Sequence, residues 1–178
     1  MRYRLTRHPD SPCAAVTEIE VDVARPPGGG LALSYIVAGN ISDLLMPAVT
    51  ESKRADELWR HTCFEAFIRG AQAGGYYEFN FAPSSQWAAY RFDGYRSGMR
   101  AATEIAAPKI EVVSAGDCCT LRAVLELSEL SVLSLGRLGL SAVIEEANGR
   151  KSYWALAHPP GKPDFHHPDC FAGKLSPA

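Results

Sequence analysis

Alternation of apolar and polar residues is the dominant pattern in this chain. In VTEIEVDV, Thr17, Ile19, Val21 and Val23 fall on one face of an extended segment, and three acidic residues fall on the other. A turn rich in proline and glycine follows, after which LALSYIVA, residues 31–38, is predicted as a returning strand. The pattern predicts a half-buried antiparallel pair at the start of the chain.

Similar segments recur to the end of the chain. LWRHTCFEAFIRG, YYEFNFA and WAAYRF form a predicted meander, PKIEVVSAGDCCTLRAVLELS reads as two strands around a turn, and a last hairpin turns at Asn148-Gly149. Residues 40–56 lack sustained alternation and are expected to form a connection with one short helical turn, whereas residues 127–136 fit either a short helix or a covered connection. The proline-rich tail from Pro159 is expected to run as an irregular strap. About nine or ten strands with little helix predict an antiparallel β-sandwich.

Length and composition narrow the class of protein. With 178 residues, 47% of them hydrophobic and 21% charged, the chain predicts a single domain over residues 1–178. A net charge of -2 and the lack of a basic cluster argue against nucleic acid and anionic membranes as partners. No apolar run is long enough to span a bilayer and no signal peptide is evident, so we expect a cytoplasmic protein. Five scattered cysteines without CxxC spacing indicate reduced thiols.

Polar side chains recur at alternate positions of the predicted meander, where a plain core strand would need only apolar residues. Strand alternation groups them on one face of the sheet. This predicted patch consists of Trp59, His61 and Glu65 from the first strand, Glu78 and Asn80 from the second, and Trp87 and Arg91 from the third. Tyr77, Phe79 and Phe81 would point to the core on the opposite face.

Acids and a guanidinium beside indole rings suit a ligand that is hydroxylated at its edge and apolar on its C–H face. A sugar ring has both properties, because charged side chains can bind vicinal hydroxyls while an aromatic plane covers the ring carbons. The alternative is a cross-strand ion pair on a solvated face, in which Arg91 neutralises Glu65 or Glu78 and nothing binds.

Three ordered motifs, ELWRHTCFEAFI, YYEFNFAPSSQWAAYRF and YWALAHPPGKPDFHHPDCF, resemble the bacterial DOMON-like domains. These are a branch of the superfamily that includes the family-nine carbohydrate-binding modules and the haem-binding or sugar-binding DOMON domains. The resemblance spans about residues 35–171 and implies an immunoglobulin-like or jelly-roll β-sandwich.

The resemblance also implies site residues. Sugar-binding relatives clasp a ring between two tryptophans while a glutamate and an arginine bind its hydroxyls, and the similar positions here are Trp59, Trp154, Glu65 and Arg91. Haem-binding relatives use a methionine and a histidine as axial ligands. The internal methionines here, Met46 and Met99, match no such motif, so haem is a secondary alternative and no cofactor is expected.

Two other classes of function stay open. His61, Cys63 and Glu65 alternate on one strand face and could supply metal ligands or a Cys-His pair. Residues two apart on a strand lie nearly 7 Å from each other, so a direct Cys-His hydrogen bond is strained, and a metal would need a third ligand from elsewhere. A protein-interaction module could instead present an edge of YYEFNFA or WAAYRF to a partner strand. We predict a non-catalytic module for a small ligand, with a carbohydrate or sugar derivative as the leading ligand class.

Overall fold

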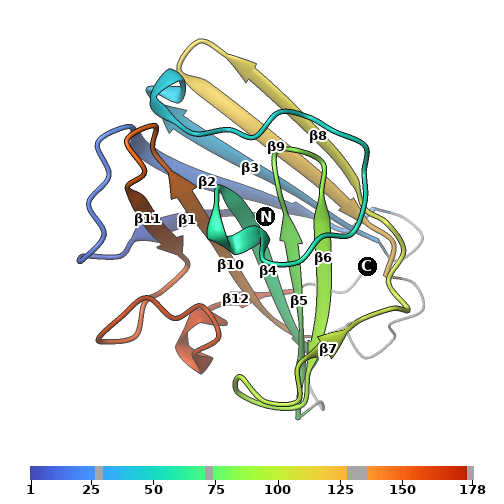
Figure 1. Cartoon of the computed structure of the whole chain (residues 1–178). Coiled ribbons are helices and arrows are strands. Elements are labelled where there is room, and N and C mark those ends of the chain that lie inside the picture. Colours follow the sequence, from blue (N-terminus) through green and yellow to red (C-terminus); the bar gives the residue numbers. More distant parts are fainter. Residues whose placement is uncertain (27–29, 71–73, 128–135, 176–178) are drawn as a thin grey trace.

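The computed structural model describes residues 1–26, 30–70, 74–127 and 136–175, and in this part of the chain nearly all regular structure is β-strand (Figure 1). The strands are β1 Arg2–Arg7, β2 Val16–Ala24, β3 Leu31–Gly39, β4 Cys63–Gly70, β5 Tyr76–Phe81, β6 Trp87–Phe92, β7 Arg100–Ala101, β8 Lys109–Ala115, β9 Cys118–Leu125, β10 Gly136–Glu145, β11 Lys151–Ala155 and β12 Gly173–Lys174. Three short 3-10 turns join them, at η1 Ile41–Asp43, η2 Leu58–Arg60 and η4 Pro168–Cys170. The prediction of an all-β fold with little helix is confirmed.

The strands form one continuous antiparallel sheet that curls into a half-barrel (Figure 1). Its strand order is β7-β6-β5-β4-β10-β11-β1-β2-β3-β9-β8, and β12 pairs with β10 beside this path. The meander β4-β5-β6 and the hairpins β8-β9 and β10-β11 follow the sequence prediction. Gly149 has a φ of 81° in the last hairpin, as a tight turn at Asn148-Gly149 requires.

The prediction of a two-sheet sandwich with nine or ten strands differs from this architecture at β1. Residues Arg2 to Leu5 pair with β2, whereas Thr6 and Arg7 pair with β11, so one strand joins the two halves of the sheet. The charged segment RYRLTR was not recognised as a strand, because its arginines lie on an exposed face and leave only Leu5 fully buried. Together with the two-residue strands β7 and β12, it raises the strand number above the prediction.

The main core fills the concave side of the curled sheet, between its two halves. Tyr35 from β3 donates a hydrogen bond of 2.7 Å to the backbone carbonyl of Glu65 on β4, and so links the halves directly. Aliphatic and aromatic side chains surround this contact, and many are completely buried, among them Ile19, Leu33, Phe64, Phe79 and Leu121. Burial of this apolar surface is the main source of stability for the fold.

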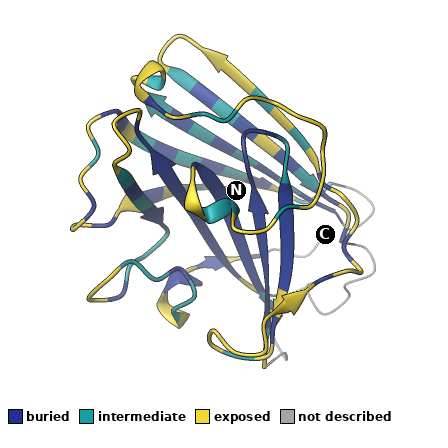
Figure 2. Ribbon diagram, viewed as in Figure 1, coloured by how far each residue is buried: buried dark blue, intermediate teal, exposed yellow. Residues whose placement is uncertain are grey.

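A second, smaller apolar cluster lies on the outer face of β4, β5 and β6. It contains Phe67, Tyr76, Tyr90 and Phe92 from the strands, and it is covered by Phe165 and Phe171 from the strap, which we define as residues 156–172. Strands β4 and β5 are therefore buried on both faces along almost their whole length (Figure 2). Their polar residues at alternate positions face this covered outer side.

Three local predictions have distinct outcomes. In β2, a bulge between Val16 and Glu18 shifts the alternation, so Val16 is buried and Thr17 is exposed, contrary to prediction. The connection over residues 40–56 contains the single turn η1, as predicted. The predicted strand from Leu58 begins only at Cys63, since Leu58–Arg60 form η2.

Some predicted connections fall partly or wholly on residues 27–29, 71–73 and 128–135, which lie outside the described residues. These are the proline-glycine turn after β2, the AQAGG turn after β4 and the segment before β10. Across the described ranges, no helix combines the length and apolar character needed to cross a membrane.

Candidate functional site

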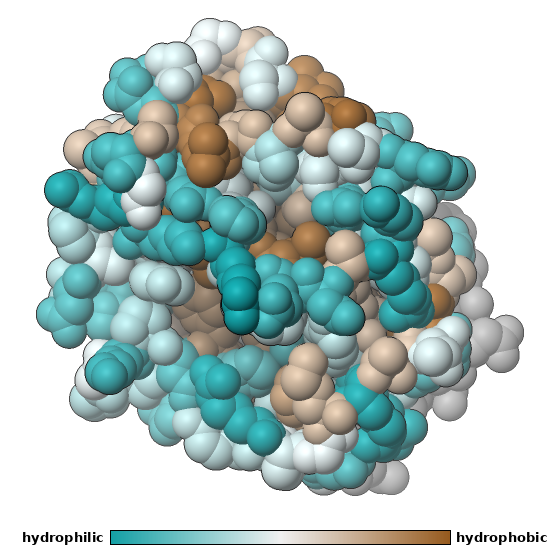
Figure 3. Space-filling view, viewed as in Figure 1, coloured by the Kyte–Doolittle hydropathy of each residue, from teal (hydrophilic) through white to brown (hydrophobic). Residues whose placement is uncertain are grey.

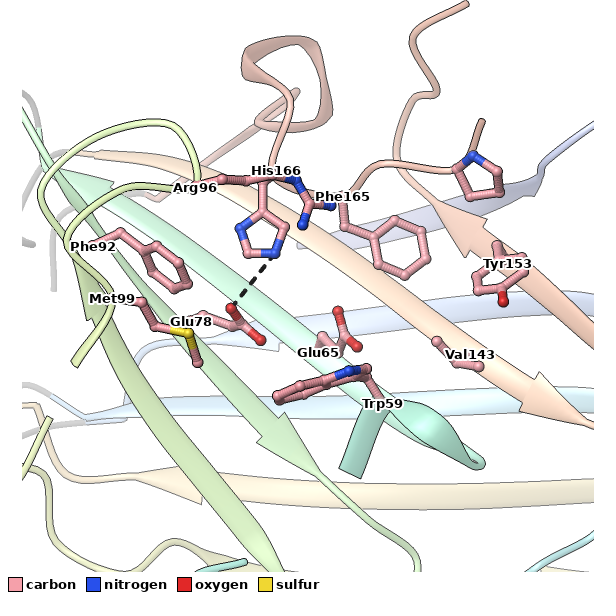
Figure 4. Close-up of a pocket in the computed structure, with 11 residues that line it drawn as sticks. Trp59, Glu65, Glu78, Phe92, Arg96, Met99, Val143, Tyr153, Phe165 and His166 are labelled. Atoms are coloured by element: carbon pink, nitrogen blue, oxygen red, sulfur yellow. Dashed lines mark ion pairs between the residues drawn. The ribbon is translucent and has the colours of Figure 1, made fainter. Parts of the chain in front are cut away.

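A cavity of about 360 Å³ lies on the outer face of the sheet, between strands β4 and β5 and the strap (Figure 4). Ligand pockets in proteins commonly have volumes of about 300–1,000 Å³. The third side is closed by the rim loop, which we define as residues 93–99 and which contributes Arg96 and Met99. The side of the molecule seen in Figure 3 is largely hydrophilic, with apolar side chains visible between the polar ones.

Two glutamates project into the cavity from neighbouring strands. Glu65 of β4 pairs with Asn80 of β5, and Glu78 pairs with Phe67, so the two acids are diagonal neighbours on one face. Their residues are only 3% and 4% exposed. Figure 4 shows both carboxyl groups directed into the space between Trp59 and His166. Buried acids of this kind are rare unless they are paired or serve a function.

Each carboxyl group has only one oxygen that accepts a hydrogen bond within the described part of the chain. Ser141 Oγ donates to Glu65 Oε2 at 3.2 Å, and Asn80 Nδ2 donates to Glu78 Oε1 at 2.7 Å. The second oxygen of Glu78 has His166 Nε2 at 3.8 Å, beyond hydrogen-bond distance. Unused acceptors that face a cavity are ready to bind donors of a ligand.

Burial and proximity shift the protonation of both acids. Desolvation raises the pKa of Glu65 well above its ordinary value, and the neighbouring Glu78 raises it further. Desolvation also raises the pKa of Glu78, to about 7, while the hydrogen bond from Asn80 and the charge of Arg96 oppose the shift. The pair therefore holds at least one proton at neutral pH.

His166 reaches the cavity from the strap and is hydrogen-bonded to Tyr76. Its Nδ1 lies 2.8 Å from the hydroxyl of Tyr76, which also accepts a hydrogen bond of 3.3 Å from the backbone N–H of Arg96. A phenol that already accepts is free to donate to Nδ1, which places the imidazole proton on Nε2, toward Glu78. Desolvation and the charge of Arg96 lower the pKa of His166 to about 4, so the ring is neutral at pH 7.

Asp164 joins the rim loop to the strap. Its Oδ1 accepts hydrogen bonds from Arg96 Nη2 at 2.7 Å and from the backbone N–H of His166 at 3.1 Å. Tyr95 donates its hydroxyl proton to Oδ2 of the same carboxylate. The arginine and the hydroxyl hold the pKa of Asp164 below its usual range although its partial burial opposes this. One carboxylate thus fixes both segments that enclose the cavity.

Aromatic side chains form the walls. Trp59 of η2 packs edge to face against Tyr90 at 6.0 Å, and it lies across the cavity from Phe165 and His166 (Figure 4). Tyr153 of β11 packs against Phe165 at 6.2 Å, and Phe92 and Val143 complete the apolar lining. The site therefore combines apolar walls with two acids at its base.

The structure brings three of the predicted site residues to this cavity, namely Trp59, Glu65 and Glu78. Asn80 is completely buried behind them, where it supports Glu78. His61 is directed elsewhere: its side chain is 66% exposed, and its Nδ1 lies 2.7 Å from Glu145 Oε2. The side chains of His61 and Glu65 thus have separate partners.

Trp87 and Arg91 do not reach the cavity, contrary to their predicted position in the patch. Trp154, which the resemblance placed in the site, does not reach it either. Arg91 pairs with Tyr77 across the β5-β6 ladder, so it shares the face of Tyr77, and its guanidinium lies 5.7 Å from that ring. Trp87 lies in the main core under the guanidinium of Arg54, 4.1 Å from the ring centroid. Trp154 also lies in the main core, and its Nε1 donates to Ser152 Oγ.

Sequence reasoning missed Arg96, His166, Phe165 and Tyr153, which all line the cavity. Three of them lie in irregular segments, where alternation predicts nothing about direction. Tyr153 adjoins the predicted Trp154, and only the pairing of Tyr153 with Val143 shows that the tyrosine faces outward. The described residues contain no group of three or more His, Cys, Asp and Glu side chains placed to hold a metal ion.

No family model and no curated protein matches this chain. A crystal structure of a protein from Bacteroides uniformis, described as a "putative carbohydrate-binding protein", is similar to it with a TM-score of 0.69. The match covers 99% of this chain and 85% of the other, at 18% sequence identity. At that identity the likeness shows a shared fold. Membership of the DOMON-like domains stays a prediction.

Proposed function

We propose that this protein is a non-catalytic module that binds a carbohydrate or sugar derivative in the cavity between β4, β5 and the strap. The observation that carries the proposal is the placement of two buried carboxyl groups, Glu65 and Glu78, at the base of a cavity of about 360 Å³ with aromatic walls. The similarity to the Bacteroides uniformis protein supports the same class of ligand.

Each part of the cavity suits one part of a sugar ring. Trp59 presents a large aromatic surface on which ring C–H groups can pack. The free oxygens of Glu65 and Glu78 accept hydrogen bonds from hydroxyls, and Arg96 at the rim can donate to ring or exocyclic oxygens. Phe165 covers the opposite side, as the second aromatic wall of a clamp in which the resemblance implied Trp154.

The electrostatics favour binding over hydrolysis. Glycosidases use two carboxyl groups whose surroundings drive their pKa values apart, so that one is an acid while the other stays ionised. Here burial raises the pKa of both Glu65 and Glu78, and no cation pairs closely with either in the described ranges. In the described ranges, neither acid has a close cation that would keep it ionised, as the nucleophile of a retaining glycosidase needs.

Haem fits this site poorly, although Met99 and His166 both line the cavity. The imidazole already has Tyr76 at Nδ1 and faces Glu78 through Nε2. Two buried carboxyl groups would also lose their last solvent contact against an apolar macrocycle, which is costly for any ionised acid. The chemistry of the cavity suits a polar ligand.

The protein-interaction alternative requires a free strand edge on YYEFNFA or WAAYRF, which form β5 and β6. Strand β5 is paired on both sides, by β4 and β6. The outer side of β6 pairs with β7 at Tyr90 and Arg91, and Arg54 forms a bridge to it at Trp87. Neither predicted edge is free along its length.

Isothermal titration calorimetry tests the proposal with glucose, galactose, mannose, N-acetylglucosamine and glucosamine as ligands. We expect at least one of them to bind the wild-type protein with a stoichiometry of one and to lose its affinity in Trp59→Ala. Haemin, added in a parallel absorbance titration, should give no Soret band of a ligated iron. Absence of binding by every sugar would overturn the proposal.

A further inference from the structure

The two glutamates of the cavity have more hydrogen-bond acceptors than the described residues around them supply donors. Glu65 lies beside Trp59 in the cavity lining (Figure 4), with one oxygen free of hydrogen bonds from the described residues. Glu78 has a second such oxygen 3.8 Å from His166. Both residues are more than nine-tenths buried. These two oxygens open to the cavity, where a ligand that donates hydrogen bonds can take the place of solvent.

The charge that Glu65 and Glu78 carry when ionised is also not balanced by a neighbouring cation of the described residues. Arg96 is the nearest guanidinium in the lining, but its Nη2 and Nε bind Asp164 Oδ1 at 2.7 and 3.2 Å. His166 is hydrogen-bonded to Tyr76, and it is neutral because burial and the charge of Arg96 lower its pKa to about 4. Among the described residues, therefore, no charged basic side chain contacts either acid as a counter-ion.

We infer that the bound sugar carries a protonated amine, and that its ammonium group lies between Glu65 and Glu78. This inference rests on the proposed function. An ammonium has three N–H donors and no acceptor, which complements two carboxylates whose free oxygens only accept. Aromatic neighbours such as Trp59 add attraction, because ring faces favour cations. A neutral hydroxyl at the same place would supply one donor and no charge.

Binding of a cation between Glu65 and Glu78 should change the protonation of the pair. The pair holds at least one proton when empty, because burial raises the pKa of Glu65 and brings that of Glu78 to about 7. An adjacent ammonium stabilises both ionised forms, so its binding must release a proton from the pair.

Tyr35 approaches Glu65 from the core side, and on the cavity side five other described groups face the pair: Cys63, Tyr76, Tyr90, Arg96 and His166. Burial raises the pKa of the Cys63 thiol and of both phenols, so these three stay neutral around pH 7. His166 is also neutral there and Arg96 stays charged. Between pH 5.5 and 7.5 the acids themselves are thus the protein groups that titrate in the cavity.

Calorimetry at pH 6.5 with glucosamine, glucose and N-acetylglucosamine tests the inference. Phosphate and MES serve as buffers, since they differ in enthalpy of ionisation and neither is a primary amine. We expect glucosamine to bind about tenfold or more tightly than glucose, the difference between one charged and one neutral hydrogen bond. Its apparent enthalpy should differ between the buffers by an amount that corresponds to proton release, whereas that of glucose should not.

Glu65→Gln and Glu78→Gln keep the shape of the side chains and remove their charge. Each should bring the affinities for glucosamine and glucose together, and Glu104→Gln, which alters an exposed acid beside Tyr77, should leave the preference unchanged. Circular dichroism checks that the variants fold.

Cyclohexylamine and cyclohexanol separate the inference from the proposed function. If glucose and glucosamine bind equally, without proton release, the ammonium site is wrong and the sugar site stands. If no sugar binds but cyclohexylamine binds and cyclohexanol does not, the sugar proposal fails and the ammonium site stands. If neither amine binds, the inference is overturned.

Discussion

Glu65 and Glu78 are diagonal neighbours on adjacent strands, and each directs a carboxyl group into the same cavity from a buried position. This relationship explains why polar residues alternate with aromatic ones in β4 and β5. One face of these strands belongs to the main core, and the other is covered by the strap, so that both faces are buried while only one needs polar groups.

Substitutions of Arg91 and Arg96 should differ in their effect on sugar binding. Arg91→Ala should leave sugar affinity within about twofold of wild type, because Arg91 lies on the face of Tyr77. Arg96→Ala should weaken it by about tenfold, through loss of a donor at the rim and of the contact with Asp164. Calorimetry with the best ligand measures both. A loss of binding confined to Arg91→Ala would contradict the placement of the site.

Substitution of the three tryptophans by alanine should lower the free energy of unfolding by different amounts. Trp87→Ala and Trp154→Ala remove side chains from the main core and should each lower the free energy of unfolding by about 3–5 kcal/mol. Trp59 is half-buried at the mouth of the cavity, and Trp59→Ala should cost about 1 kcal/mol. Urea unfolding followed by far-UV circular dichroism measures these costs. Similar costs for all three would mean that Trp59 is a core residue.

The raised pKa of Glu78 predicts a pH-dependent stability. A carboxyl group with a pKa of about 7 in the folded state and an ordinary value in the unfolded state keeps its proton more firmly when folded. Its contribution to stability therefore falls as pH rises from about 4.5 to 7. The Glu78→Gln side chain cannot lose a proton. As pH rises over this range, the free energy of unfolding of this variant should therefore increase relative to that of wild type, by up to about 3 kcal/mol.

His166 must be separated from this effect, because its pKa is lowered to about 4 and its contribution has the opposite sign. Stability due to His166 rises with pH between about 4 and 6.5, since the unfolded state binds the proton more tightly there. The measured quantity is thus the difference between Glu78→Gln and wild type at each pH, with Glu104→Gln as control. A difference that is independent of pH would contradict the shifted pKa.

Asp164 should govern the mobility of the rim. Asp164→Asn removes the charge that holds Arg96 and Tyr95, so the rim loop and the strap should exchange their amide hydrogens faster while β4 and β5 remain protected. Hydrogen exchange followed by mass spectrometry measures this, and Asp169→Asn, at an exposed side chain, is the matched control. Equal exchange in both variants would show that Asp164 does not hold the segments together.

Alternation predicted most of the strands, because that pattern is local to each segment, and the assignment of Glu65 and Glu78 to one face agrees with the pairing of β4 and β5. The relative phase of neighbouring strands is not local. Arg91 and Glu78 were assigned to one face, but β6 pairs so that Tyr90 opposes Glu78 and Arg91 opposes Tyr77. A shift of one residue in register reverses every side chain of a strand.

Residues in irregular segments were beyond this kind of reasoning. Arg96 has a φ of 50°, and His166 follows a loop fixed by Asp164, so their directions depend on tertiary contacts. The aromatic and histidine residues of PDFHHPDCF marked the tail as unusual, yet nothing in their spacing indicated which would cover the sheet. Contacts across some 90 residues, such as that between Tyr76 and His166, decide the site.

The most direct test of the sugar site uses the indole N–H resonances of the three tryptophans in a ¹H–¹⁵N correlation spectrum. Addition of the sugar that binds best should shift the Trp59 signal in a saturable manner and leave those of Trp87 and Trp154 in place, because only Trp59 lines the cavity. The Trp59→Phe variant assigns the signal. Saturable binding that leaves the Trp59 signal unmoved would contradict the account.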